Sequence, residues 1–216
     1  MRLYLASRSI GNHGDRLLEL VGENKKVIHI NNAKDCYKPR DYEEKNVEIR
    51  EMFGDMGLEV VMLDLRKYFG KKEELGKFVD GEKPGLIFAS GGNTFILRRA
   101  MRQSGFDEIL KRDLMKDKYV YAGGSAGSVV MGPSLEGFQD DDNPKKIPEG
   151  YGYEPETTWE GLGIIGERII PHADADFGWK SARKLEKEFR EKGWKYEMMN
   201  DSDVLVVDGE RREVLR

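Results

Sequence analysis

The sequence predicts a single α/β domain over residues 1–216, in which helices cover both faces of a mostly parallel sheet to give three layers. Short apolar runs alternate with longer amphipathic segments, as in the strand, helix, strand units that build parallel sheets. The chain of 216 residues is long enough for one sizeable core. Its composition, 38% hydrophobic and 35% charged, is that of a globular protein with a charged surface.

The apolar runs predict the strands. The run at residues 26–30 is continuous and bounded by turn residues, which is typical of a central parallel strand with helices on both faces. The predicted strands are residues 3–6, 26–30, 58–63, 85–89, 119–122 and 203–209, with further short apolar segments at 161–165 and 168–172.

The segments between these runs predict the helices. At residues 41–56, apolar side chains recur at near-helical spacing and Gly57 follows as a stop. The predicted helices are residues 15–21, 41–56, 72–79, 95–101, 106–115 and 178–192. Residues 133–160 show no period, so we expect a long irregular excursion, a feature that in compact domains is commonly functional or mobile.

A glycine-flanked serine follows the fifth predicted strand. Gly123 and Gly127 bracket Ser125 in the pattern G-x-S-x-G. In a nucleophile elbow this pattern makes a sharp strand-to-helix turn that exposes the serine hydroxyl. The alternative is an ordinary glycine-rich connection, because short glycine patterns recur by chance.

A second glycine loop, Gly91-Gly92-Asn93-Thr94, also follows a strand and precedes a helix. Backbone amides in this context bind anions, so the loop could hold a phosphate or supply half of an oxyanion hole. Neither the phosphate-loop nor the dinucleotide consensus is present, which disfavours a nucleotide site. In the second interpretation, the amides of Gly92 and Ala126 form the two-donor hole.

A serine needs a base to take its proton, and the sequence holds three histidines. His29 lies inside an apolar strand and is better explained as a core residue. His13 lies in a loop after the first strand. His172 ends an apolar run and opens a polar stretch, so it is the preferred base, with His13 second.

These motifs resemble a known family. Ser90-Gly91-Gly92-Asn93-Thr94-Phe95, Gly124-Ser125-Ala126-Gly127-Ser128, the segment 161–165 and Pro171-His172 are similar, in order, to the dipeptidase E and cyanophycinase family of serine peptidases. That family resembles the class I glutamine amidotransferases in fold.

The resemblance implies roles for individual residues. It implies Ser125 as nucleophile, His172 as base, Gly92 and Ala126 as oxyanion donors, and Asn93 with its loop neighbours Gly91 and Thr94 as substrate contacts. It also implies a small peptide substrate with aspartate at the amino-terminal position, and neither metal nor cofactor.

The acid that orients His172 is not fixed by the sequence. Counting from the nucleophile as in the family reaches Asp140, within an acidic run that is otherwise explained as a solvated turn. The late segment offers Asp201, which we favour slightly. A cation for the substrate aspartate is expected near His172; Lys180 and Arg183 are candidates, although an exposed helix face explains both better.

Charge and cysteine content limit the partners. A net charge of −4 and an isoelectric point of about 5.6 give no electrostatic footprint for nucleic acid. No signal peptide or membrane-spanning stretch is recognised, so we expect a cytoplasmic protein that does not bind membranes. Cys36 is the only cysteine, which argues against disulfides and thiolate metal sites. A homodimer is left open.

Two other functions are left open as well. One is a cyanophycinase-like hydrolase that cleaves β-aspartyl bonds, and the other is an amidotransferase-like binding domain without catalysis.

Overall fold

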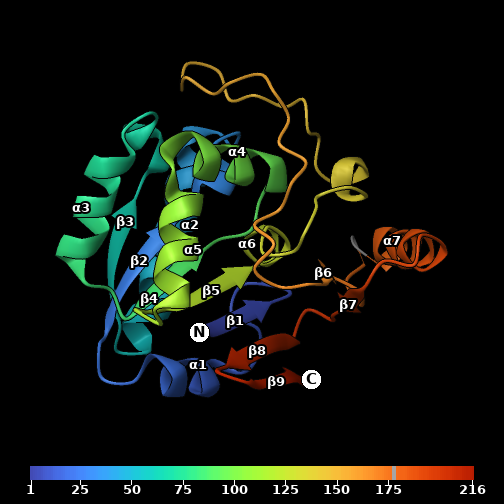
Figure 1. The fold of residues 1–216 in the computed structure, drawn as a ribbon, viewed down its shortest axis with the longest axis horizontal. Coiled ribbons are helices and arrows are strands. Elements are labelled where there is room, and N and C mark those ends of the chain that lie inside the picture. Colours follow the sequence, from blue (N-terminus) through green and yellow to red (C-terminus); the bar gives the residue numbers. More distant parts are fainter. Residues whose placement is uncertain (177–178) are drawn as a thin grey trace.

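A seven-stranded sheet lies at the centre of the computed structural model, which describes residues 1–176 and 179–216 and the side chains of residues 1–176 and 181–216 (Figure 1). The strands are β1 (Arg2–Ala6), β2 (Lys26–Ile30), β3 (Glu59–Leu63), β4 (Leu86–Ala89), β5 (Val120–Gly124), β6 (Arg168–Ile170), β7 (Tyr196–Met198), β8 (Val204–Asp208) and β9 (Arg211–Leu215). The order in the main sheet is β3-β2-β4-β5-β1-β8-β9, and the first five of these strands are parallel. β8 and β9 pair antiparallel at one edge, so the predicted mostly parallel α/β fold is confirmed.

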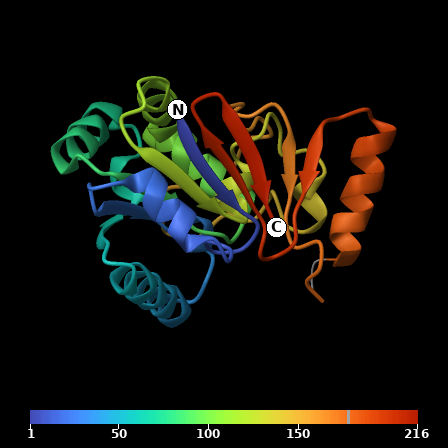
Figure 2. The ribbon, with the colours of Figure 1, turned by 90° about the horizontal axis from the view of Figure 1, so that it is seen from below.

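Helices cover both faces of this sheet. They are α1 (Gly14–Val21), α2 (Pro39–Asp55), α3 (Lys72–Glu82), α4 (Thr94–Ser104), α5 (Phe106–Met115), α6 (Ala126–Val129) and α7 (Trp179–Glu191). Apolar residues of α1 and α2 pack on one face, and those of α3 to α6 pack on the other. Figure 2 shows the two groups on opposite sides of the strands. These two apolar layers are the core that holds the strand ends in place.

The strand register sets the position of the functional loops. Ala6 of β1 is the partner of Gly124 in β5, and Ala89 of β4 is the partner of Gly123. The chain that leaves β4 and the chain that leaves β5 therefore emerge side by side at the carboxyl edge of the sheet, where α/β proteins place their sites.

A small second sheet extends the molecule beyond the main one. β6 and β7 pair in parallel with each other and not with the seven strands, and α7 packs against them. The excursion between α6 and β6 passes over α4 in Figure 1. It is closed at its base by an isolated bridge between Ser134 and Glu160. No helix within residues 1–176 and 179–216 is long and apolar enough to cross a membrane.

Several predicted elements differ from the observed ones. The apolar segment 161–165, for which no strand was assigned, lies outside the strands, and the helix expected to start after Ser125, α6, is only four residues long. The prediction did not include β7 or β9. β9 carries Arg211, Arg212 and Glu213 at the sheet edge, where charged residues are common but weaken the apolar signal of a strand. Gly178, the predicted first residue of the last helix, lies outside the described residues.

Candidate active site

Ser125 lies at the tip of a strained turn between β5 and α6. Its φ is 51° and its ψ is −111°, which is an uncommon conformation for a residue with a side chain. Such strain persists only where the surrounding structure enforces it, and it clusters at functional sites. Here the Ser125 amide donates to the Ala6 carbonyl of the neighbouring strand at 3.1 Å. The turn therefore has the backbone geometry that the G-x-S-x-G pattern predicts.

The flanking glycines are required by close backbone approaches. A Cβ on Gly127 would lie 2.1 Å from the Ala89 carbonyl oxygen, and a Cβ on Gly123 would lie 2.4 Å from the Gly127 backbone. Either contact is far inside van der Waals distance. Any side chain at these positions would push α6 away from β4 and move Ser125.

His172 reaches Ser125 from the loop after β6. Its Nε2 lies 3.0 Å from Ser125 Oγ, which is hydrogen-bonding distance. The His172 backbone is also in a left-handed conformation, with φ of 63°, and its amide donates to the Ser7 hydroxyl at 2.8 Å. Ser7 follows β1 directly, so the main sheet holds the base in position.

Asp201 lies on the other side of the imidazole, in the loop between β7 and β8. Its Oδ1 is 2.6 Å from His172 Nδ1, and its Oδ2 accepts from Arg8 at 3.0 Å. Burial opposes ionisation of this carboxyl, but the hydrogen bonds from His172 and Arg8 prevail and lower its pKa. An ionised carboxylate only accepts, so His172 Nδ1 must donate and its neutral Nε2 accepts from the serine.

Asp140 lies elsewhere, which corrects the alternative that named it as the orienting acid. Its exposed carboxylate pairs with Lys184 of α7. The segment around Asp140 reaches the cavity, but the Asp140 carboxylate contacts α7 and not the imidazole. Among the two predicted acids, Asp201 is therefore the one that contacts His172.

The second glycine loop lies beside Ser125. A Cβ on Gly91 would be 3.0 Å from Ser125 Cβ. Gly92 has φ of 144°, and a Cβ there would be 2.5 Å from the Ala33 carbonyl oxygen, so only glycine fits. Within the described part of the chain, the amides of Gly92 and Ala126 donate no hydrogen bond. Both are therefore available to an anion.

Asn93 and Thr94 begin α4 and serve the helix as well as the site. The Asn93 side chain caps the helix by accepting from Ile96 N at 2.9 Å. The Thr94 amide donates to Asp142 at 2.7 Å. Burial raises the pKa of Asp142, and the hydrogen bonds from Thr94 partly offset this. Asp142 belongs to the acidic run that the sequence explained as a solvated turn, so its place beside α4 is unexpected.

A cavity of about 580 Å³ opens in front of Ser125 and His172. It is large enough for a small peptide. Asn93, Thr94 and Gly92 line one side of it, α7 contributes residues such as Ala182 and Leu185, and the excursion contributes the segment 141–143 and Lys146.

Three residues at the site were missed by the sequence analysis. Ser7 holds the His172 backbone, Arg8 pairs with Asp201, and Asp174 accepts from the Asp201 amide at 2.8 Å. Ser7 and Arg8 are the first polar residues after β1, and polar residues at the carboxyl ends of parallel strands are a signal that could have identified them.

The other histidines serve different purposes. His29 is fully buried, and its Nε2 lies 2.5 Å from the Ser90 hydroxyl. Burial lowers the pKa of His29 to about 3, so it stays neutral near pH 7. His13 precedes α1, where its carbonyl accepts from the helix amides of Arg16 and Leu17. In the structure it is His172 that contacts Ser125.

No arrangement for a metal ion was found in the part of the chain that the structure describes, where no group of three His, Cys, Asp or Glu side chains converges. Of the two proposed specificity cations, Arg183 is not among the described residues that line the cavity. Arg183 is exposed and pairs with Glu186 of its own helix, and the side chain of Lys180 lies outside the described residues.

Comparisons with known proteins give the family of the chain. Residues 7–214 match peptidase family S51. An uncharacterised peptidase of Listeria innocua is 27% identical over 128 residues, which span 59% of this chain and 58% of that protein's length. An uncharacterised peptidase of Pasteurella multocida is 27% identical over 174 residues, 79% of this chain and 76% of the relative.

Solved structures show the same fold. A Listeria monocytogenes protein named as a peptidase E superposes with a TM-score of 0.79 over all of this chain and 98% of its own, at 21% identity. A peptidase from an acI-B1 actinobacterium gives 0.67 over 99% of this chain and 86% of its own, at 20% identity. The assignment to a family rests on the match over nearly the whole chain, and the solved structures support the fold. The chain therefore belongs to peptidase family S51, the family of dipeptidase E.

Proposed function

We propose that the chain is a serine peptidase that hydrolyses small peptides with aspartate at the amino-terminal position. The observation that carries the proposal is the continuous hydrogen-bonded row from Ser125 through His172 to Asp201, with distances of 3.0 and 2.6 Å. Family membership supports the serine peptidase chemistry, and the preference for aspartate is the finer part of the proposal.

In the proposed reaction, Ser125 Oγ attacks the carbonyl carbon of the scissile peptide bond while His172 Nε2 takes its proton. The resulting imidazolium is stabilised by the ionised Asp201. His172 then returns the proton to the leaving amine, and an acyl-enzyme remains on the serine. A water molecule, deprotonated by the same imidazole, hydrolyses this ester and releases the acid.

The negative oxygen formed at each attack needs donors that are already in place. The amides of Gly92 and Ala126 have no partner among the described residues; Ala126 follows Ser125 directly, and Gly91, the neighbour of Gly92, lies against Ser125. They are the proposed oxyanion donors. Losing one donor of this kind typically costs about 10²- to 10³-fold in turnover.

The experiment measures hydrolysis of Asp-Leu by the wild type, Ser125→Ala and Ser134→Ala. The readout is the amount of free leucine released. Ser134 is a matched control because its hydroxyl lies at the base of the excursion and accepts from the Glu136 amide. We expect loss of turnover in Ser125→Ala only, with the fold intact by circular dichroism. Unchanged turnover in Ser125→Ala would refute the proposed nucleophile.

The β-linked isomer of the same dipeptide, assayed in parallel, identifies the bond that is cleaved. Turnover of the α-linked peptide alone supports the proposal. Turnover of the β-linked peptide alone would assign the cyanophycinase-like activity instead, and the absence of both would favour a binding domain.

A further inference from the structure

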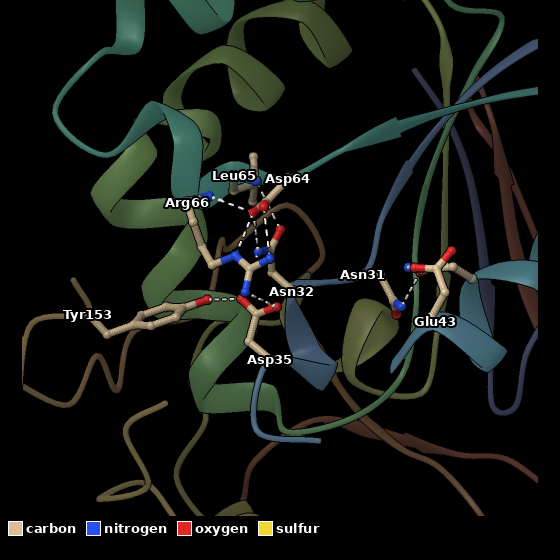
Figure 3. A network of polar contacts seen from close by, with 9 residues as sticks. Asn31, Asn32, Asp35, Glu43, Asp64, Leu65, Arg66 and Tyr153 are labelled. Atoms are coloured by element: carbon tan, nitrogen blue, oxygen red, sulfur yellow. Dashed lines mark hydrogen bonds and ion pairs between the residues drawn. The ribbon is translucent and has the colours of Figure 1, made fainter. Parts of the chain in front are cut away.

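The excursion, residues 133–160, is fixed to the body of the molecule along its length. At its tip, the Tyr153 hydroxyl donates to Asp35 at 2.5 Å. Arg66 lies between Asp35 and Asp64, at 3.4 and 2.8 Å from their carboxylates, and Figure 3 shows this network. The Ser134 to Glu160 bridge closes the base. The segment that reaches the cavity is therefore held from both ends.

Arg99 of α4 holds the middle of the excursion. Its side chain is fully buried. Its guanidinium donates to the carbonyls of Pro144 at 3.0 Å, Lys146 at 3.5 Å and Glu156 at 3.1 Å. Within the described residues it has no carboxylate partner. Burying a cation without a counter-charge is costly unless its donors find partners, and here three carbonyls of the excursion accept from it.

Lys146 is the residue that this anchoring presents to the cavity. Its carbonyl accepts from Arg99 and its amide donates to Asn143, so its backbone is fixed. Among the described residues that line the cavity, Lys146 is the one lysine or arginine. Its side chain is exposed, and it forms no ion pair with any described carboxylate.

The two acids of the cavity are already engaged. The Ser181 hydroxyl donates to Asp141, and the Thr94 amide donates to Asp142. Neither acid forms an ion pair with Lys146. The excursion thus contributes two acidic side chains, Asp141 and Asp142, and one basic side chain, Lys146, to the cavity lining. An amino-terminal acidic residue, with an ammonium group and a side-chain carboxylate, is complementary to such a lining.

We propose that Lys146 is a specificity-determining residue that binds the side-chain carboxylate of an amino-terminal acidic residue, and that Arg99 is the positioning residue that holds it at the cavity. The inference rests on the proposed function, because it names the side chain that selects the substrate of the same site. It assigns selectivity to the excursion, in place of the cations on α7 that the sequence suggested.

The test compares kcat/KM for Asp-Leu and Asn-Leu, which differ in one carboxylate. We expect Lys146→Met to lower the Asp-Leu to Asn-Leu ratio about 10- to 100-fold, mainly through KM for Asp-Leu, since a hydrogen bond to a charged group is lost. Lys146→Arg keeps most of the ratio. Lys145→Met is the matched control, because Lys145 is the adjacent exposed lysine and does not line the cavity.

Arg99 is tested by the same ratio. Arg99→Met should lower the ratio while Ser125 still reacts with a small neutral serine-directed probe, and Arg99→Lys should restore part of it. Arg102→Met is the control, because Arg102 pairs with Glu154 at the exposed part of the excursion. A ratio unchanged in Lys146→Met, or lowered equally in Lys145→Met, overturns the inference.

Failure of the proposed function gives a different result. In that case the wild type hydrolyses neither dipeptide. Protection of Ser125 against the same probe then decides the inference: aspartate should protect better than asparagine in the wild type, and Lys146→Met should abolish the difference. Equal protection by the two amino acids in the wild type overturns it.

Discussion

Replacing Asp201 with asparagine tests how the imidazole is oriented. The carboxylate contacts His172 Nδ1 at 2.6 Å and is itself held by Arg8 and by its backbone amide bond to Asp174. Asparagine has nearly the same shape, so these surroundings should keep the residue in place. Its amide group can donate to Nδ1, which would move the imidazole proton to Nε2, where it faces Ser125 and blocks general base catalysis.

The size of the loss follows from the charges. During attack the imidazolium and the carboxylate are opposite unit charges about 4 Å apart between centres, which is worth about 4 kcal/mol at an effective dielectric constant of 20. That energy corresponds to about 10³-fold in rate. The wrong tautomer adds to this loss, so we expect kcat for Asp-Leu to fall about 10³- to 10⁴-fold, with little change in KM.

Asp140→Asn is the matched control, since Asp140 is the other acid that the sequence offered. Its carboxylate pairs with Lys184 at the surface. Because exposed ion pairs contribute little energy, we expect the kcat of Asp140→Asn to stay within about twofold of the wild-type value. Steady-state hydrolysis of Asp-Leu measures both variants. A loss in Asp140→Asn as large as in Asp201→Asn, or an Asp201→Asn enzyme within tenfold of the wild type, would refute the assignment.

Two further predictions concern the framework of the site. Because burial lowers the folded-state pKa of His29 from 6.5 to about 3, the unfolded chain binds this proton first as the pH falls below 6.5, and stability is lost on acidification down to about pH 3. Between pH 7 and 4.5 the wild type should lose about 2–3 kcal/mol more unfolding free energy than His29→Gln, as measured by urea titrations. Ser90→Ala keeps the buried histidine, so its unfolding free energy should depend on pH as in the wild type. The same pH dependence in the wild type and in His29→Gln would contradict this. Gly127→Ala should destabilise the fold by at least about 2 kcal/mol because its Cβ meets the Ala89 carbonyl at 2.1 Å, whereas Gly166→Ala, which meets nothing within 4 Å, should leave the melting temperature nearly unchanged.

The parallel core of the fold could be predicted from the sequence because its strands are buried on both faces. β2 was predicted at its observed bounds, residues 26–30, since a short, mostly apolar run between turn residues is typical of a strand covered by helices on both sides. β7 was missed because its three residues are only partly buried and a tertiary contact with β6 decides their conformation. Such context overrides a local pattern.

The part of the candidate site around Ser125 could be predicted because a sharp turn at a nucleophile requires a short sequence motif. The sharp turn at Ser125 brings its flanking glycines against backbone, Gly123 against Gly127 and Gly127 against Ala89, so the pattern that such a turn requires is visible in the chain. The acid beside His172 is different, because it only needs to reach Nδ1 and can come from any loop at that edge. Counting residues led to Asp140, whereas the fold brings Asp201 to the imidazole. The excursion likewise placed Asp142 and Lys146 at the cavity without any local signal.

Labelling with a serine-directed fluorophosphonate, followed by peptide mass spectrometry, tests most directly whether Ser125 is an activated nucleophile. Its hydroxyl contacts a histidine whose other nitrogen contacts an ionised carboxylate, so we predict one adduct on the Ser125 peptide of the folded wild type, and none in Ser125→Ala or His172→Ala. A folded wild type that takes no label, or takes it on another residue, would contradict the assignment of this serine as the reactive centre.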